Sequence, residues 1–243
     1  MKFYIGLHQP FDAQHFDAVC ISVNRLRRRK GPFQVGEWMM DSGSFTEVST
    51  HGDYRSTVEE YADQIKRWRH NGFLVAAVSQ DYMCEPWILE RTQLTVDDHQ
   101  RLTISRYDDL LRCQTGCYIM PVLQGYEPAD YVRHVRQYGS RLDQGMWVGV
   151  GSVCKRNGDP SAIETVLLAI HHERPDLRLH GFGLKSTALN SGLTRELLAS
   201  ADSMAWSYHA RMNRRNGNDW REAQSWLARI EERPTQRPLF IPA

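Results

Sequence analysis

The sequence predicts a (β/α)8 barrel, a closed sheet of eight parallel strands surrounded by helices. Short β-branched or apolar runs alternate with helical stretches along the chain, which is typical of parallel β/α units. Eight such runs can be counted. The chain has 243 residues, and neither an internal repeat nor a low-complexity linker divides it. We therefore expect one barrel domain over residues 1–243.

The predicted strands are short and mostly apolar, as expected for buried strands. They cover residues 3–7, 18–23, 38–41, 74–79, 118–123, 147–151, 177–182 and 202–206. Six helices are predicted over residues 57–70, 97–113, 129–138, 161–172, 193–200 and 219–232. The first two connections between strands are too short or too irregular for full-length helices. The barrel should therefore be irregular in its first two β/α units.

Local signals support several of the helices. Ser56 and Thr57, with Glu59 and Glu60 just inside, form a start signal, and Pro128 and Pro160 mark the starts of two further helices. Apolar residues between Ile163 and Ile170 recur three and four positions apart, as on a helix packed against a sheet. These patterns agree with helices that cover the outside of a barrel.

Composition excludes several classes of protein. Lys and Arg number 30 against 29 Asp and Glu, so the net charge of +1 excludes a histone-like polycation or an acidic tail protein. Hydrophobic residues make up 41% and mean hydropathy is −0.54, as in an ordinary soluble domain. Apolar runs such as residues 73–78 are too short to span a bilayer. The N-terminus turns polar by His8 and lacks a signal-peptide pattern, so we expect a cytoplasmic protein without membrane association.

Polar residues follow several predicted strands at their carboxyl ends, where barrel enzymes place their active sites. Asp41 ends the third strand, Asp81 and Gln124 follow the fourth and fifth, and Asp202 opens the eighth. Asp is disfavoured within strands, so Asp41 directly after a buried run suggests a functional role. Taken alone, Asp41 or Asp202 would be explained equally well as a turn or helix-capping residue.

Glycines accompany these polar residues. Gly43, Gly125, Gly151 and Gly183 each stand at or just after a strand end. Glycine removes Cβ bulk and would let a flat ligand approach the backbone amides. Phe45 could supply an aromatic face for a planar ring, although a core aromatic is an equally good interpretation. Asp81 and Gln124 offer acceptors and donors suited to a purine edge.

Four segments, in order along residues 38–211, resemble the tRNA-guanine transglycosylase superfamily, whose fold is a (β/α)8 barrel. Residues 41–45, Asp-Ser-Gly-Ser-Phe, resemble its Asp-Ser-Gly-Gly-Phe/Tyr motif. Residues 123–125 are similar to its Val-Gln-Gly segment, and residues 181–183 to its Gly-Val-Gly. Residues 202–211 are similar to the archaeal-type Asp-Ser-Ala-Ala-Tyr segment that carries the nucleophile.

The resemblance implies a role for each matching residue. Asp202 would be the nucleophile that attacks the sugar and displaces the base, and Asp41 the general acid/base. Asp81, Gln124 and the backbone of Gly151 and Ser152 would bind the edge of the base. The substrate-binding set implied in this way is Phe45, Asp81, Gln124, Gly125, Gly151, Ser152, His180 and Gly181. His180 stands where the family usually has the methionine that covers the second face of the base.

The chemistry of base exchange agrees with two carboxylates in different environments. One ionised carboxylate traps the oxocarbenium-like sugar, and a second group handles the proton of the leaving base. One base simply replaces another, so no nucleotide cofactor is needed, and no Gly-rich phosphate loop is present. The expected cofactor set is therefore empty.

The zinc-binding subdomain of the tRNA enzymes is not expected here. Their Cys-x-Cys-x-x-Cys motif follows the barrel, whereas this sequence has no cysteine after Cys154. Cys113 and Cys117 lack a second pair at ligand spacing, so no metal site is expected. A compact barrel without zinc looks like the deoxypurine-in-DNA branch, found in phages and bacterial modification clusters. That branch exchanges guanine in DNA for a 7-deazaguanine, such as 7-cyano-7-deazaguanine, and its members share segments similar to residues 150–156 and 218–221.

DNA binding would depend on local basic residues, because the net charge is close to zero. The candidates lie in loops after the second, sixth and eighth strands: Arg27, Arg28, Lys155, Arg156, Arg211, Arg214 and Arg215. A solvated charge run is the alternative for residues 25–30. The target guanine would have to be flipped out of the duplex into the site.

Three alternatives remain open from the sequence. The acceptor could be tRNA, although the missing zinc motif argues against it. The barrel could be a non-catalytic subunit that binds nucleic acid or a deazapurine and acts through accessory modification proteins, although two carboxylates would then have no purpose. An unrelated nucleoside hydrolase is the third.

Overall fold

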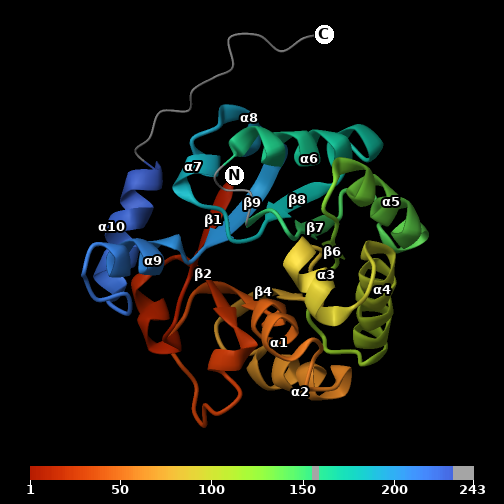
Figure 1. Cartoon of the computed structure of the whole chain (residues 1–243). Coiled ribbons are helices and arrows are strands. Elements are labelled where there is room, and N and C mark those ends of the chain that lie inside the picture. The colour runs from red at the N-terminus through yellow and green to blue at the C-terminus, as the bar shows by residue number, and fades with distance from the viewer. Residues whose placement is uncertain (155–158, 232–243) are drawn as a thin grey trace.

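The computed structural model describes residues 1–154 and 159–231, and these form a nearly closed parallel barrel with helices around it (Figure 1). The strands are β1 (Lys2–Gly6), β2 (Ala18–Ser22), β3 (Glu37–Asp41), β4 (Phe73–Val78), β5 (Ile119–Met120), β6 (Val122–Leu123), β7 (Trp147–Val150), β8 (Arg178–Gly181) and β9 (Leu198–Ser203). Their order is β5-β4-β3-β2-β1-β9-β8-β7-β6, and every paired neighbour is parallel. The predicted α/β barrel is confirmed.

Helices fill most connections between the strands. The α-helices are α1 (Ser44–His51), α2 (Val58–Trp68), α3 (Pro86–Thr92), α4 (Val96–Arg112), α5 (Pro128–Tyr138), α6 (Pro160–Glu173), α7 (Ser186–Leu189), α8 (Gly192–Leu197), α9 (Ala205–Met212) and α10 (Trp220–Glu231). The first two connections contain only the short 3-10 helices Pro10–His15 and Val23–Arg25. This is the irregularity that the sequence predicts.

Proline splits the predicted fifth strand into β5 and β6, which form the two ends of the strand order. Pro121 has no N–H, so it cannot donate to a neighbouring strand. Its carbonyl still accepts a hydrogen bond from the Gly149 amide at 2.8 Å, while the Met120 carbonyl accepts from Ser79 at 3.0 Å. The segment therefore pairs with β4 on one side and β7 on the other.

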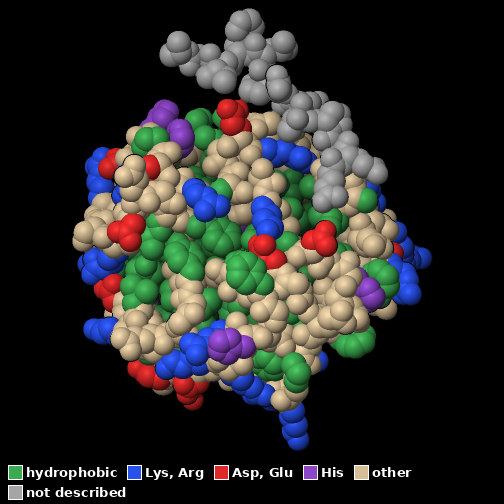
Figure 2. Space-filling view, turned by 180° about the vertical axis from the view of Figure 1, so that it is seen from behind, with side chains coloured by type: hydrophobic (Ala, Val, Ile, Leu, Met, Phe, Trp, Pro, Cys, Tyr) green, Lys and Arg blue, Asp and Glu red, His purple; other side chains and the backbone are tan. Residues whose placement is uncertain are grey.

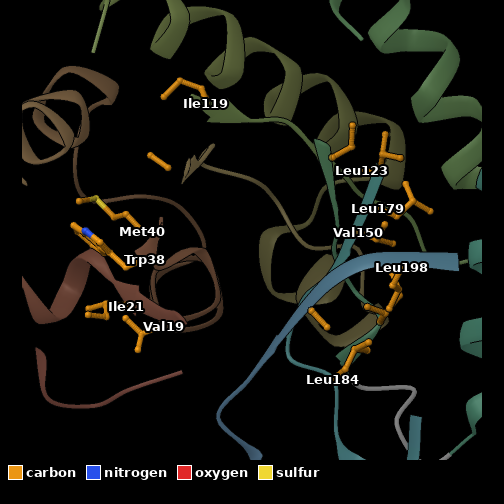
Figure 3. Packing of buried hydrophobic residues seen from close by; sticks show 14 of the residues in the cluster. Val19, Ile21, Trp38, Met40, Ile119, Leu123, Val150, Leu179, Leu184 and Leu198 are labelled. Carbon is orange, nitrogen blue, oxygen red and sulfur yellow. The ribbon is translucent and has the colours of Figure 1, made fainter. Parts of the chain in front are cut away.

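Successive side chains along each strand point alternately into the barrel and outward to the helices, which gives two hydrophobic cores. Side chains of one parity, including Tyr4, Cys20, Met39 and Met120, pack together inside the barrel. Side chains of the other parity pack against the helices, and Figure 3 shows Val19 and Ile21 of β2 beside Trp38 and Met40 of β3, with Leu123, Val150, Leu179 and Leu198 grouped further round the sheet. Because the side-chain period of a strand is two, residues two positions beyond an interior residue also face the interior.

The helix starts use the expected capping chemistry. Thr57 at the start of α2 and Thr95 at the start of α4 both form capping boxes, with Glu60 and Asp98 as the reciprocal partners. Pro128 and Pro160 occupy the first helical positions of α5 and α6. None of the helices in residues 1–154 and 159–231 is both long and apolar enough to cross a membrane.

The end of the barrel differs from the sequence prediction. The eighth predicted strand, residues 202–206, is instead β9 over Leu198–Ser203, and the residues from Ala205 onward form α9. The predicted helix over 193–200 ends at Leu197. Pairing with β1 and β8 imposes a strand on a Leu-rich segment whose local preference is helical. Asp202 consequently lies at the carboxyl end of its strand.

Candidate active site

Asp41 and Asp202 extend the interior rows of β3 and β9. Asp41 lies two residues beyond Met39, an interior residue, and is paired in register with Ser22 at the end of β2. Asp202 lies two residues beyond Ser200, whose hydroxyl contacts the buried His180. Both carboxylates therefore stand at the carboxyl-terminal face of the barrel, where the sequence predicts the site.

The pKa of the Asp41 carboxyl group is raised above its ordinary value of 3.8. Burial, reinforced by the negative charge of Asp202, raises the pKa of Asp41 to about 6. Hydrogen bonds from the Ser22 hydroxyl and from the Gly43 amide, 3.0 Å from Oδ2, act in the opposite direction. Gly43 supplies this amide with a φ of 76°, a conformation that glycine adopts without strain. The influence of Asp202 on Asp41 indicates that the two carboxylates share one electrostatic environment.

Among residues 1–154 and 159–231, the contacts to the Asp202 carboxylate are at one oxygen, Oδ1. Its Oδ1 accepts a hydrogen bond from the Gly183 amide at 3.0 Å and lies 3.4 Å from His180 Nε2. The Asp202 side chain keeps 13% of its surface exposed, whereas that of His180 is fully buried. The imidazole packs against the rings of Trp147 and Phe182. His180 therefore contacts the candidate nucleophile from within the barrel.

A second buried polar group lies at the ends of β4 and β6. Burial raises the pKa of Asp81 to about 7, with a smaller contribution from the charge of Asp41. The Gln124 amide and the Ser44 hydroxyl donate to the Asp81 carboxylate and oppose that shift. Ser152 Oγ lies 2.8 Å from Gln124 Oε1 and 3.0 Å from Glu85 Oε2. These side chains form one connected set of donors and acceptors.

Glycine at the neighbouring strand ends is required by close packing. A Cβ on Gly151 would lie 2.1 Å from Gln124 Nε2, so Gly151 makes the room in which the Gln124 amide sits. A Cβ on Gly125 would approach Asp130 Cβ to 2.7 Å, and one on Gly181 would approach the Leu184 side chain to 2.7 Å. Gly151 is the one of these three that positions a predicted base-binding side chain directly.

Two aromatic side chains lie together beside the strand ends. Phe45 is 45% exposed in the first turn of α1, and Trp87 is 41% exposed in α3. Their rings meet edge to face with centroids 6.1 Å apart. Phe45 is expected from the motif, whereas Trp87 is not, because no helix is predicted over the connection that contains α3.

The predicted DNA-binding arginines fall into two groups. In the first, Arg27 donates to Ser56 Oγ at 2.9 Å, while Arg28 is exposed. In the second, Arg211, Arg214 and Arg215 are all exposed; Arg211 donates to Ser207 at 2.9 Å, and Arg215 pairs with Glu222 at 3.2 Å. The other two candidates, Lys155 and Arg156, lie outside the described residues.

Sequence reasoning names Gly183 only as a strand-end glycine and assigns no supporting role to Ser22, Ser44 or Ser200. Ser22, Ser44 and Gly183 hydrogen bond to the three aspartates, and Ser200 contacts His180. Alternation along β2 predicts that Ser22 faces the barrel interior, because it lies two residues after Cys20. The same prediction for Ser200 requires the observed bounds of β9. Across residues 1–154 and 159–231, no group of three or more His, Cys, Asp or Glu side chains is arranged to hold a metal ion.

These features define a class of protein: a parallel α/β barrel with interacting carboxylates at the carboxyl ends of its strands, the arrangement of barrel enzymes. The chain belongs to the family DpdA, described as DeoxyPurine in DNA protein A, which it matches over residues 1–229. The resemblance to the deoxypurine-in-DNA branch of the transglycosylase superfamily is thereby confirmed, and family membership supports a transglycosylase-like function. No curated protein matches the chain.

Proposed function

We propose that the protein exchanges guanine in DNA for a free 7-deazaguanine base, through a covalent intermediate on Asp202. The observation that carries the proposal is the electrostatic interaction of Asp41 with Asp202 at one end of the barrel. Membership of the DpdA family supports DNA as the acceptor, because the family description refers to deoxypurine in DNA. The accessory proteins of a modification cluster would act as further partners.

In the first half-reaction, the Asp202 carboxylate attacks C1′ of the deoxyguanosine. A bond forms between the carboxylate oxygen and C1′ while the N-glycosidic bond breaks, and the electron pair leaves with guanine. Protonated Asp41 gives its proton to the departing base, which leaves as neutral guanine. A pKa of about 6 suits this role, because a group that titrates near the working pH both gives and regains a proton readily.

The second half-reaction reverses these steps with the incoming base. Ionised Asp41 takes the proton from the nitrogen of the 7-deazaguanine that attacks C1′. The new glycosidic bond forms, the ester to Asp202 breaks, and the Asp202 carboxylate is regenerated. The number of glycosidic bonds does not change, so the exchange needs no oxidant, reductant or nucleotide cofactor.

Base recognition falls to the group around Asp81. Its carboxyl, the Gln124 amide and Ser152, with the adjoining Gly125, Gly151 and Gly181 backbone, supply donors and acceptors for the edge of a guanine-type base. Phe45 is exposed for stacking on one face. The enzyme would use the same set for the outgoing and incoming bases, because guanine and its 7-deaza analogue share this edge.

DNA binding is assigned to Arg27, Arg28, Arg211, Arg214 and Arg215, with Lys155 and Arg156 as further candidates from the sequence. Arginine side chains neutralise phosphates without reading sequence. The guanine must leave the base stack to reach the end of the barrel, at a cost of about a few kcal/mol that these phosphate contacts would offset.

Base exchange in vitro tests the proposal. Duplex DNA, single-stranded DNA and tRNA are each incubated with radiolabelled 7-cyano-7-deazaguanine and the protein, and label in the nucleic acid is counted. We expect incorporation into DNA, a loss of at least about 10³-fold in Asp202→Ala, and a smaller loss in Asp41→Asn. Asp108→Asn, which removes a partly exposed carboxylate paired with Arg141, is the matched control and should retain wild-type incorporation.

Three results would contradict the proposal. Incorporation by Asp202→Ala at the wild-type rate would exclude Asp202 as the nucleophile. Label in tRNA but not in DNA would favour the tRNA alternative. Binding of DNA or the deazapurine without exchange, with the accessory cluster proteins supplied, would favour a non-catalytic subunit.

A further inference from the structure

A row of hydrogen-bonding side chains crosses the barrel interior and ends at Asp202. Trp147 Nε1 donates to Ser200 Oγ at 2.8 Å, Ser200 Oγ lies 2.9 Å from His180 Nδ1, and His180 Nε2 lies 3.4 Å from Asp202 Oδ1. The row depends on an irregularity in the sheet. The β8/β9 register shifts between Leu179 and His180, which places His180 directly beside Ser200.

The row begins at the opposite end of the barrel from the carboxylates. Trp147 is the first residue of β7 and lines a pocket of about 460 Å³ with Ser200, Lys2 and Glu37, of which Lys2 and Glu37 begin β1 and β3. Seen from behind, the molecule has hydrophobic side chains gathered near the middle of its face, with charged side chains around them (Figure 2). Trp147 therefore lies at the amino-terminal ends of the strands, away from the proposed substrate.

The donor and acceptor roles along the row follow from elementary chemistry. An indole N–H can only donate, so Ser200 Oγ accepts from Trp147 and keeps its own proton for His180 Nδ1. A neutral imidazole that accepts at Nδ1 carries its proton at Nε2. The opposite tautomer would direct a nitrogen lone pair at the ionised carboxylate of Asp202. The row thus favours an Nε2–H that faces Asp202.

We propose that His180 is a positioning residue for the nucleophile, oriented by Ser200 and Trp147, an inference that rests on the function proposed for Asp202. His180 and the Gly183 amide both contact Oδ1, and no donor to Oδ2 is found among the described residues. Attack on C1′ is therefore assigned to Oδ2. The two donors on Oδ1 fix the carboxylate plane and stabilise the charge that returns to Asp202 when the ester breaks.

This role differs from that of a side chain that stacks on the base. The His180 side chain is fully buried, and its ring is enclosed by Tyr4, Trp147 and Phe182. A stacking residue would chiefly affect KM for the incoming base. A residue that orients the nucleophile affects kcat, because it acts on the bond-making steps and leaves ground-state binding of the base unchanged.

Steady-state base exchange on duplex DNA with 7-cyano-7-deazaguanine separates these possibilities. His180→Leu, which lacks any donor, should lower kcat by about 10- to 100-fold with KM for the base within about twofold. In His180→Gln the amide nitrogen can reach the position of Nε2. Its log kcat should recover at least about a third of the difference between His180→Leu and wild type. Trp147→Phe should lower kcat by about 3- to 10-fold, although it lies at the far end of the strands.

Replacement of a second buried histidine serves as the control for a general loss of stability. His99 in α4 contacts the Met83 carbonyl at 2.6 Å, and His99→Leu should lower the melting temperature as His180→Leu does while keeping kcat within about twofold of wild type. Each variant is compared at a temperature where circular dichroism shows it folded.

The outcomes are distinct for the two proposals. A wild type that does not exchange bases overturns both. With an active wild type and an inactive Asp202→Ala, a folded His180→Leu that retains wild-type kcat overturns the positioning role alone. So does a loss in His180→Leu that appears only in KM, or an equal loss of kcat in His99→Leu.

Discussion

Replacement of Asp81 by asparagine should make the protein more stable, with an effect that depends on pH. Burial is the largest cause that raises the pKa of Asp81 from its ordinary value of 3.8 to about 7. The folded state therefore holds this proton more tightly than the unfolded state. The contribution of protonated Asp81 to the free energy of unfolding is fully present below pH 3.8 and is lost as the pH rises through about 7.

The magnitude follows from the two pKa values. Each pH unit between 3.8 and about 7 corresponds to about 1.4 kcal/mol, so ionised Asp81 costs about 4 kcal/mol of folding free energy at pH 8. Asparagine carries no charge, and its oxygen can still accept from the Gln124 amide. Loss of the charge-assisted bond from Gln124 offsets about 1 kcal/mol. We expect Asp81→Asn to raise the free energy of unfolding by about 2 to 4 kcal/mol at pH 8.

Urea unfolding followed by circular dichroism at pH 4 and pH 8 measures this effect. The difference between Asp81→Asn and wild type should fall below about 1 kcal/mol at pH 4, where Asp81 is largely protonated in the folded state. Asp108→Asn, at a partly exposed carboxylate paired with Arg141, should change the free energy of unfolding by less than about 1 kcal/mol at either pH. A destabilised Asp81→Asn at pH 8, or a difference that does not vary with pH, would show that ionisation of Asp81 does not destabilise the folded state.

Three further changes test other parts of the structure. Gly151→Ala places a Cβ 2.1 Å from Gln124 Nε2, so it should displace the Gln124 amide. The free energy of unfolding in urea should fall by about 1 to 3 kcal/mol, and guanine binding measured by calorimetry should weaken. Unchanged guanine binding would contradict the role of Gln124. Tyr131→Phe removes a buried hydroxyl that donates to the Gly151 carbonyl at 2.8 Å, and should cost about 1 kcal/mol in the same assay. Arg28→Ala should reduce the slope of log K against log salt for DNA binding by about 1, and an unaltered slope would remove Arg28 from the interface.

The sequence predicts most of the barrel because apolar runs and start signals coincide with the strands and longer helices. Helix α4, predicted over 97–113, covers Val96–Arg112, and α6, predicted over 161–172, covers Pro160–Glu173. The short helices α1 and α3 were missed. Neither has a side-chain hydrogen bond at its first cap, and with 8 and 7 residues both are too short for a periodic apolar face to stand out in the sequence.

The aspartates at the strand ends could be predicted, because polar residues after buried runs contrast with their surroundings. Their supporting partners could not, because those depend on register. His180 lies beside Ser200 because the pairing of β8 with β9 shifts register between Leu179 and His180. The predicted strand over 202–206 does not include Ser200, so this contact could not be predicted. Trp87 lies beside Phe45 because α3 packs next to α1, and that tertiary contact cannot be predicted from local sequence.

The central claim, that Asp202 forms the bond to the sugar, is tested most directly by mass spectrometry of the trapped intermediate. Guanine-containing DNA is incubated with the protein without an incoming base, denatured, and digested with nuclease and protease. We expect a deoxyribose-containing mass on the peptide with Asp202, and none in Asp202→Ala. The same mass on Asp41, or base exchange by wild type without any adduct on Asp202, would contradict it.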